Sequence, residues 1–259
     1  RPRIVELSAE YDYKLTPDRL EKELGTGSPK AILFNSPNNP AGTVYSREEL
    51  EPLCRLFLDS GIAVISDEIY EFLVYDGAEH VSPVALMPEL KAQTVVVTGV
   101  SKSYAMTGWR IGFGLADEAV AYRMSAYQAH ATGCPNSISQ WTALEALEKG
   151  AGDRERMRVD FEKRMRMFGE GLARVPRISW PKPQGAFYFF VDVSDLYEDC
   201  GVSTSTEFCE KLLAEDGLLV IPGGPFGCDN MIRFSFAASE AELTGALERF
   251  ERFVKKYAG

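Results

Sequence analysis

The sequence predicts an α/β fold in which a mostly parallel sheet forms a large domain and a smaller α/β domain follows at the carboxyl end. Short runs rich in Val and Ile alternate with stretches of helical periodicity, which is typical of parallel βαβ units. Long helical stretches replace this alternation after Gly114, and short strand-like runs return from Pro176 onward. We therefore predict a large domain over residues 1–173 and a small domain over residues 174–259.

Four runs in the first hundred residues are predicted strands, because β-branched residues dominate them. Runs of this kind are typical of strands that helices cover on both faces. The runs are RIVEL (3–7), AILFN (31–35), AVIS (63–66) and TVVVTG (94–99). Two helices are predicted between them. TPDRLEKEL (16–24) opens with Thr and Pro, and SREELEPLCRLFLDSG (46–61) opens with Ser followed three residues later by Glu, the pattern of a capping box.

The second half of the chain is predicted to contain long helices and then short strands. Apolar residues recur at intervals of three and four in the helical stretches. The predicted helices are 116–130, 136–149 and 152–173, followed in the small domain by helices near 204–215 and 239–256. The predicted strands of the small domain are GAFYFFVDV (185–193), LLVIP (218–222) and MIRFSFA (231–237).

Composition and charge exclude several classes of protein. The 259 residues are 45% hydrophobic and 25% charged, which is typical of a globular fold. A net charge of −10 argues against nucleic acid as a partner, because phosphate binding needs a basic face. The five cysteines are scattered without a CxxC pair, so we predict neither disulfides nor a metal site, and a reducing cytoplasm fits best. No apolar run is long enough to span a bilayer, so no membrane partner is expected.

Polar residues gather directly after three predicted strands, the place where parallel α/β sheets bind ligands. AILFN is followed by SPNNPAGTVYS, AVIS by DEIY, and VVVTG by VSKSYAMTGWRIGFG. Each has an ordinary interpretation when taken alone: a turn for SPNNPAG, a helix cap for Asp67, a solvated surface lysine for Lys102 and an ion-pair partner for Arg110. Their convergence on one sheet edge indicates instead a site for an anionic, aromatic ligand.

Three of these segments carry a specific resemblance. NSPNNPAGTVYS, ISDEIYEFLVYDG and GVSKSYAMTGWRIGFG resemble, in order and spacing, the signature segments of class I/II pyridoxal-5′-phosphate (PLP) aminotransferases of fold type I. PQGAFYFFVDVS, VIPGGPFG and IRFSFA are similar to small-domain segments of the same family. CPNSISQWTALEAL and AMTGWRIG most resemble the bacterial aspartate aminotransferase subgroup. The resemblance covers essentially the whole chain and implies fold type I and a PLP cofactor.

The resemblance implies three catalytic residues and their cofactor contacts. Lys102 would form the Schiff base with PLP and later move the proton of the substrate Cα. Asp67 would pair with the pyridine nitrogen and keep it protonated. Tyr70 and Asn39 would donate hydrogen bonds to the phenolate oxygen of the ring.

The resemblance also implies anion-binding residues. Arg110 would pair with the cofactor phosphate through its guanidinium group, and Ser101 would add a hydroxyl. Gly99 departs from the commoner pattern, in which a serine stands three residues before the lysine. Arg233 would bind the α-carboxylate of the substrate, and Asn39 is the second predicted substrate-binding residue. GAFYFF is predicted to build core, and the two histidines, which have no motif around them, are predicted to be structural.

The implied reaction is ping-pong transfer of an amino group from an L-amino acid, with aspartate as one candidate, to a 2-oxo acid. Another PLP reaction of the β-lyase type and a catalytically silent fragment remain as alternatives. Specificity for aspartate, aromatic amino acids or alanine stays open, because AYQAHATGCPNS lacks the arginine that some relatives place there. The family is usually dimeric, so a homodimer is expected.

Members of the family extend further at the amino end, where they carry the first strands and a glycine-rich phosphate loop. In the sheet of the family, RIVEL would have no neighbouring strand, and unpaired buried strand edges are costly. We therefore expect that an amino-terminal portion of the large domain is missing from this chain. The alternative is a rearranged minimal protein that binds PLP weakly or not at all.

Overall fold

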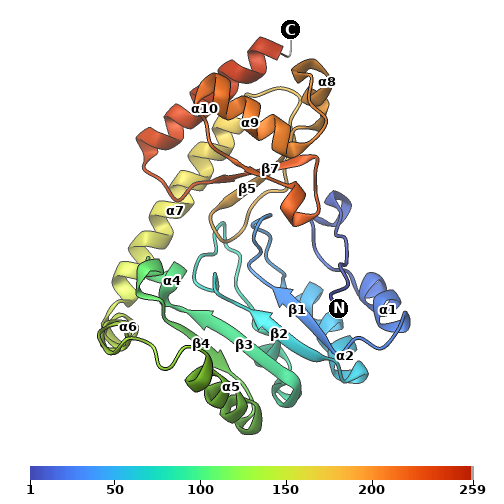
Figure 1. The fold of residues 1–259 in the computed structure, drawn as a ribbon, viewed down its shortest axis with the longest axis vertical. Coiled ribbons are helices and arrows are strands. Elements are labelled where there is room, and N and C mark those ends of the chain that lie inside the picture. Colours follow the sequence, from blue (N-terminus) through green and yellow to red (C-terminus); the bar gives the residue numbers. More distant parts are fainter. Residues whose placement is uncertain (258–259) are drawn as a thin grey trace. The chain divides into compact units, whose positions relative to one another are not determined.

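The structure is a computed structural model that describes residues 1–257, and contacts divide the chain into two compact units (Figure 1). Unit 1 contains residues 1–7, 14–38 and 44–158, and unit 2 contains residues 8–13, 39–43 and the chain from residue 159 onward. Helix α7 (Ala151–Leu172) begins in unit 1 and ends in unit 2. The predicted division at residue 173 stays a prediction, and each unit is described by itself below.

Unit 1 is built from alternating strands and helices in the first half of the chain. Its strands are β1 (Ala31–Asn35), β2 (Ala63–Asp67), β3 (Thr94–Gly99) and β4 (Gly112–Leu115). Its helices are α1 (Pro17–Gly25), α2 (Arg47–Ser60), α3 (Pro83–Leu86), α4 (Val100–Ser103), α5 (Glu118–Ala131), α6 (Ser137–Lys149) and the start of α7, with 3-10 turns η2 (Pro88–Gln93) and η3 (Thr107–Trp109). In the part of the chain that the structure describes, no helix combines the length and the apolar content needed to cross a membrane.

The sheet of unit 1 has the order β1-β2-β3-β4 (Figure 1). β1, β2 and β3 are parallel, which confirms three of the predicted strands, and β4 pairs antiparallel with β3. The sequence analysis missed β4, because its residues GFGL carry two glycines and no β-branched side chain. The result is a mostly parallel sheet with one antiparallel edge.

Helix α2 covers one face of this sheet and shows why the predicted helices form. Ser46 accepts from the backbone N–H of Glu49, whose side chain accepts from the backbone of Ser46, so the predicted capping box is present. The helix ends at Gly61, whose φ of 63° is the left-handed conformation that glycine adopts most easily. Its inward face, including Leu50, Leu53, Cys54 and Phe57, packs with Phe34 and Val64 of the sheet.

The predicted strand at residues 3–7 is wrong. Residues 1–7 form no strand in the described chain, because no other segment pairs with their backbone. Val5 and Leu7 pack instead against the hydrophobic cluster of unit 1, and Arg3 donates to the backbone carbonyls of Glu23 and Thr26. Within the described chain, RIVEL therefore contributes two partly buried side chains to the cluster and no strand to the sheet.

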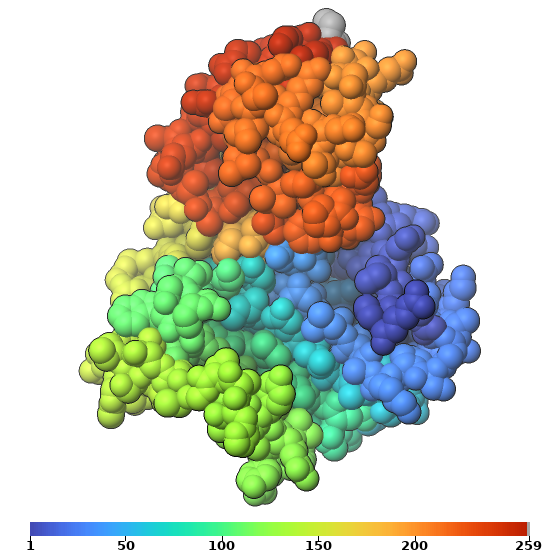
Figure 2. Space-filling view, viewed as in Figure 1, coloured from blue at the N-terminus to red at the C-terminus, as the bar shows by residue number. Residues whose placement is uncertain are grey.

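The expectation that helices cover both faces of the sheet is also wrong for the described chain. Leu33 and Ile65 are register neighbours on β1 and β2 and are 72% and 37% exposed, and Val97 on β3 is 36% exposed. Helices α5 and α6, yellow-green at the surface in Figure 2, carry further exposed apolar side chains. These are Val120, Tyr122, Met124, Tyr127, Ile138, Trp141, Leu144 and Leu147. Unit 1 thus presents an extensive apolar surface.

Unit 2 contains a second, smaller sheet. Its elements are η1 (Ala9–Tyr11), β5 (Tyr188–Asp192), η4 (Ser194–Leu196), α8 (Tyr197–Cys200), α9 (Ser205–Asp216), β6 (Ile221–Pro222), η5 (Gly224–Phe226), β7 (Met231–Ser235) and α10 (Glu240–Tyr257). The order is β5-β7-β6 and both pairings are antiparallel. Of the predicted strand 218–222, only Ile221–Pro222 form a strand in the structure. Phenylalanines form much of the core, with Phe234 of β7 packing against Phe168 of α7 and Phe250 of α10 at ring-centre distances of 5.4 and 5.1 Å.

Candidate functional site

The strand ends of unit 1 bring several predicted site residues together. β2 and β3 are neighbours and run parallel, so their carboxyl ends lie at the same edge of the sheet (Figure 1). Asp67 is the last residue of β2 and pairs in register with Val97 of β3. β3 ends at Gly99 and leads directly into the short helix α4, which carries Ser101 and Lys102. Ligands of parallel α/β sheets bind at such an edge.

Tyr70 and Lys102 face each other at this edge. Lys102 Nζ lies 5.9 Å from the centre of the Tyr70 ring, and Tyr70 is only 4% exposed. A tight turn after β2 places the tyrosine, since the N–H of Glu71 donates to the carbonyl of Glu68 at 2.9 Å and the N–H of Leu73 donates to that of Tyr70 at 2.8 Å. The segments that follow β2 and β3, about thirty residues apart in sequence, therefore bring the amine of Lys102 and the phenol of Tyr70 close together.

The carboxyl group of Asp67 is half-buried and electrostatically perturbed. Burial raises its pKa above the ordinary value for aspartate, the hydrogen bond that Oδ1 accepts from the N–H of Ile69 at 3.2 Å lowers the pKa, and the charge of neighbouring Glu68 raises it. Burial is the largest of these effects. A cation placed beside Asp67 would favour its anionic form, because opposite charges stabilise each other most where water is excluded.

A hydrogen-bond network that the sequence did not reveal fixes the segment after β2. The buried carboxylate of Glu68 accepts from the hydroxyls of Ser66 and Ser82, both at 2.8 Å, and lies 2.9 Å from Nε2 of His80. The structural role predicted for His80 agrees with this contact. The partners of Glu68 are up to 14 residues away along an irregular loop, so no periodic pattern could indicate their contact.

The segment between Lys102 and β4 has an unusual backbone. Ala105 and Arg110 have φ values of 52° and 56°, a conformation that is unfavourable for residues with a side chain and is often found at functional sites. Arg110 is exposed, and its Nη1 donates to the carbonyl of Thr107 at 2.9 Å. Ser101 is half-buried on α4.

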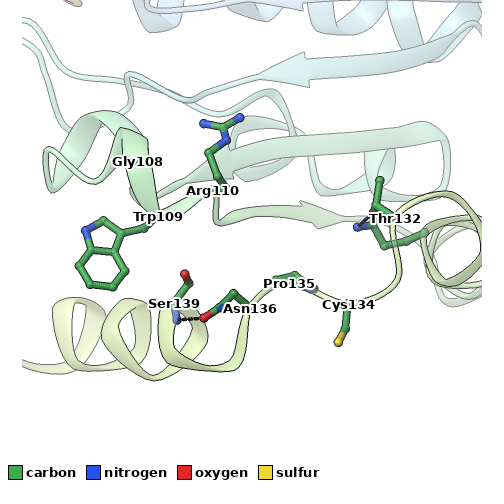
Figure 3. A pocket seen from close by; sticks show the side chains of 9 residues that line it. Gly108, Trp109, Arg110, Thr132, Cys134, Pro135, Asn136 and Ser139 are labelled. Carbon is green, nitrogen blue, oxygen red and sulfur yellow. Dashed lines mark hydrogen bonds between the residues drawn. The ribbon is translucent and has the colours of Figure 1, made fainter.

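Arg110 also lines a cavity of about 440 Å³ in unit 1 (Figure 3). The lining residues come from η3, from the end of α5 and from the start of α6: Gly108, Trp109, Arg110, Gln128, Thr132, Cys134, Pro135, Asn136 and Ser139. Asn136 caps α6 by accepting from the N–H of Ser139 at 3.2 Å. Figure 3 shows the guanidinium group of Arg110 pointing away from this cap.

The two predicted substrate-binding residues lie in unit 2 and contact each other. Arg233 of β7 donates from Nη1 to Oδ1 of Asn39 at 2.7 Å. Its guanidinium carbon lies 4.4 Å from the centre of the Tyr188 ring and 5.2 Å from that of Phe226, so two aromatic faces hold it. Its Nε is buried and has no hydrogen-bond partner within residues 1–257. Arg233 therefore offers a fixed, incompletely satisfied donor group suited to a carboxylate.

The GAFYFF segment has a double role in unit 2. Tyr188, Phe189 and Phe190 are buried, which agrees with the predicted core role. Tyr188 additionally supports Arg233, a contact that the sequence alone did not indicate. The register of β5 against β7 places Phe190 directly opposite Arg233, and Tyr188 two residues earlier, so only the strand pairing reveals this proximity.

These features are those of an α/β protein in which polar and charged side chains gather at the carboxyl ends of parallel strands. Residues 1–250 match the family model of aminotransferase class I and II, so the chain belongs to this family. An aspartate aminotransferase of Bacillus sp. (strain YM-2) is 42% identical over 254 residues, which are 98% of this chain and 64% of that protein. The chain thus spans just under two thirds of the length of this relative.

Solved structures agree with the family assignment and with fold type I. The aspartate aminotransferase from Rhizobium meliloti superimposes with a TM-score of 0.92 at 35% identity, covering 98% of this chain and 65% of that one. An aromatic aminotransferase from Pyrococcus horikoshii OT3 superimposes with a TM-score of 0.90 at 34% identity, covering 99% and 68%. The predicted family resemblance is therefore confirmed.

Proposed function

We propose that the protein is a PLP-dependent aminotransferase that moves an amino group from an L-amino acid to a 2-oxo acid by a ping-pong mechanism. The observation that carries the proposal is the convergence of Asp67, Tyr70 and Lys102 on one edge of the sheet of unit 1. Aspartate is the first candidate donor, because the relatives from Bacillus and Rhizobium are named aspartate aminotransferases. Aromatic amino acids are the second candidate donors, because the similar protein from Pyrococcus is named an aromatic aminotransferase.

The residues of this edge fit PLP. The half-buried carboxyl of Asp67, with its raised pKa, is a group that a protonated pyridine nitrogen would satisfy. Tyr70 supplies a buried phenol, and Lys102 supplies the amine that would bond to the cofactor aldehyde. Arg110 and Ser101 would hold the phosphate. When bound, PLP supplies a ring that accepts the electron pair left on the substrate Cα after proton loss.

Three side chains of the protein would then have separate roles in proton transfer and hydrogen bonding. The amine of Lys102 would take the proton from the substrate Cα and return it later, which requires the amine to lie on the same side as that proton. The carboxylate of Asp67 would hold the proton on the ring nitrogen. The phenol of Tyr70 would donate a hydrogen bond to the phenolate oxygen of the cofactor ring, and its burial keeps water from competing for this hydrogen bond.

Substrate binding is assigned to the pair in unit 2. Arg233 would bind the α-carboxylate bidentately, since its planar fork is already oriented by Tyr188, Phe226 and Asn39. The buried Nε without a partner in the described chain is the donor that a carboxylate would complete. The cofactor contact of Asn39 that the family resemblance implies is retained as part of the proposal.

A homodimer and a cytoplasmic location complete the proposal. The exposed apolar side chains of α5 and α6 support an interface, because patches of this kind mark association surfaces. The cysteines form no disulfide with one another in the part of the chain that the structure describes, which supports a reducing compartment. Sedimentation velocity of the purified protein tests the dimer, and a monomer at micromolar concentration would contradict it.

The test of the activity begins with a spectrum. Adding PLP to the purified protein is expected to produce the visible absorbance of lysine-bound PLP, which the Lys102→Ala variant lacks and which the Lys30→Ala control at an exposed lysine retains. An L-amino acid alone should then bleach the band, and a 2-oxo acid should restore it. Absence of the band in the wild-type protein, or its persistence in Lys102→Ala, would refute the proposal. Release of ammonia in place of reversible bleaching would assign a β-lyase.

A further inference from the structure

Arg154, in the first turns of α7, contacts both segments that carry the predicted catalytic residues of unit 1. Its guanidinium carbon lies 3.6 Å from the centre of the Phe72 ring, and Phe72 follows Tyr70 by two residues. Its Nη1 donates to the hydroxyl of Tyr104 at 3.0 Å, and Tyr104 follows Lys102 by two residues. The same guanidinium carbon is 5.6 Å from the centre of the Tyr104 ring. One planar cation thus joins the two loops.

Tyr104 is held firmly enough to transmit this contact. Its ring packs against the cluster formed by Val100, Met106, Ile111 and Ala143. A Cβ built on Gly150, at the junction of α6 and α7, would lie 3.0 Å from Tyr104 Cε1, so the ring already touches the backbone there. The hydroxyl of Tyr104 is therefore a fixed acceptor for Arg154.

The loop after β2 is tied to α7 at a second point. Nη1 of Arg158, one helical turn after Arg154, donates to the carbonyl of Val74 at 3.2 Å. Arg158 thus reaches this loop at a backbone carbonyl, whereas the guanidinium group of Arg154 lies over the Phe72 ring. Lying over one ring while donating to another residue suits a guanidinium group, whose N–H donors are spread over a planar fork, better than the compact ammonium group of a lysine.

We propose that Arg154 is a positioning residue that sets Tyr70 and Lys102 relative to each other, by stacking on Phe72 and donating to Tyr104. The consequence for chemistry rests on the proposed function, but the positioning itself does not. Loss of the guanidinium group frees both loops at once, because each loses the same partner. The effect reaches Lys102 and Tyr70 through their neighbours, since Arg154 contacts Phe72 and Tyr104.

Hydrogen exchange of the protein without PLP tests the positioning separately from the activity. In Arg154→Gln, amides in residues 68–75 and in residues 100–105 are expected to exchange at least about threefold faster than in the wild type. Arg156→Gln is the matched control, because Arg156 is on the same helix and forms an ion pair with exposed Asp153. Faster exchange confined to α7, or equal changes in the control, would overturn the proposal. If Arg154→Gln does not fold, Phe72→Leu removes the stacked ring and should loosen the same two segments.

Kinetics and spectra of the PLP-loaded protein give the second readout. Arg154→Gln is expected to lower kcat about tenfold or more with KM changed less than about twofold, because ligand contacts remain while the geometry of the amine is lost. The pH dependence of the absorbance of lysine-bound PLP should shift in Arg154→Gln and stay unchanged in Arg156→Gln. Tyr104→Phe should add little in the Arg154→Gln background, since both remove the same contact. A kcat of Arg154→Lys equal to that of the wild type would show that a positive charge is sufficient at this position, and it would refute the role proposed for the planar guanidinium group.

Discussion

Replacing Gly99 with alanine or serine is expected to destabilise unit 1 at the start of the segment that carries Lys102. Gly99 pairs with Gly112 where β3 and β4 approach each other. A Cβ at Gly99 would lie 2.9 Å from the Cα of Gly112 and 2.9 Å from the carbonyl oxygen of Ile111. It would lie 3.3 Å from Cδ1 of Ile69. Because the two nearest atoms belong to the backbone, the strands themselves must separate.

Two opposing effects decide the size of the change. Forcing extra atoms into a packed site typically costs about 1–3 kcal/mol. The backbone of Gly99 is extended, with φ 169°, so alanine adopts it without strain and stabilises by roughly 0.4–1 kcal/mol through the unfolded state. The cost of overpacking exceeds this gain over nearly the whole range, and the net loss is about 0–2.6 kcal/mol. For a protein of this size that lowers Tm by up to roughly 10 °C.

Thermal unfolding followed by circular dichroism measures the effect. Gly108→Ala is the matched control, because a Cβ built there meets nothing within 4 Å, and it should leave Tm unchanged or slightly raised. A Tm for Gly99→Ala at or above the wild-type value would refute the argument from close approach. A serine at this position would bring its Cβ equally close to the backbone of Ile111 and Gly112.

Three further results are expected. Without PLP, Asp67→Asn should raise the unfolding temperature more at about pH 7 than at about pH 3. Because burial raises the folded-state pKa of Asp67, its carboxyl group contributes its full stability below the unfolded-state pKa and loses that contribution as the pH rises through the folded-state pKa. Equal shifts in the unfolding temperature at both pH values would argue against burial as the cause. Ser46→Ala should cost about 1 kcal/mol in urea unfolding through loss of the cap of α2, and no change in the midpoint would contradict that role. Phe57→Ala, at a fully buried position, should cost about 3–5 kcal/mol in the same assay, whereas a loss below about 1 kcal/mol would mean that the cluster beneath α2 repacks.

Local patterns determined most of the secondary structure. The caps at Thr16 and Ser46, and the β-branched runs of β1, β2 and β3, depend on residues within a few positions of one another. The same local signals failed where pairing decides the outcome. RIVEL has strand composition but no partner in the described chain, and GFGL has poor strand composition but pairs with β3. Strand formation needs a neighbouring backbone, which no local pattern contains.

The sequence by itself determined which residues are proposed to carry the chemistry, because Asp67, Tyr70 and Lys102 follow predicted strands and the motifs around them are specific. The tertiary structure alone decided several side-chain contacts within each unit. In unit 1, Glu68 contacts His80 and Ser82 and Arg154 contacts Phe72 and Tyr104, and in unit 2 Arg233 lies against Tyr188, all between residues distant in sequence. Such contacts arise when whole elements pack, so their geometry depends on the register and packing of every element between the partners.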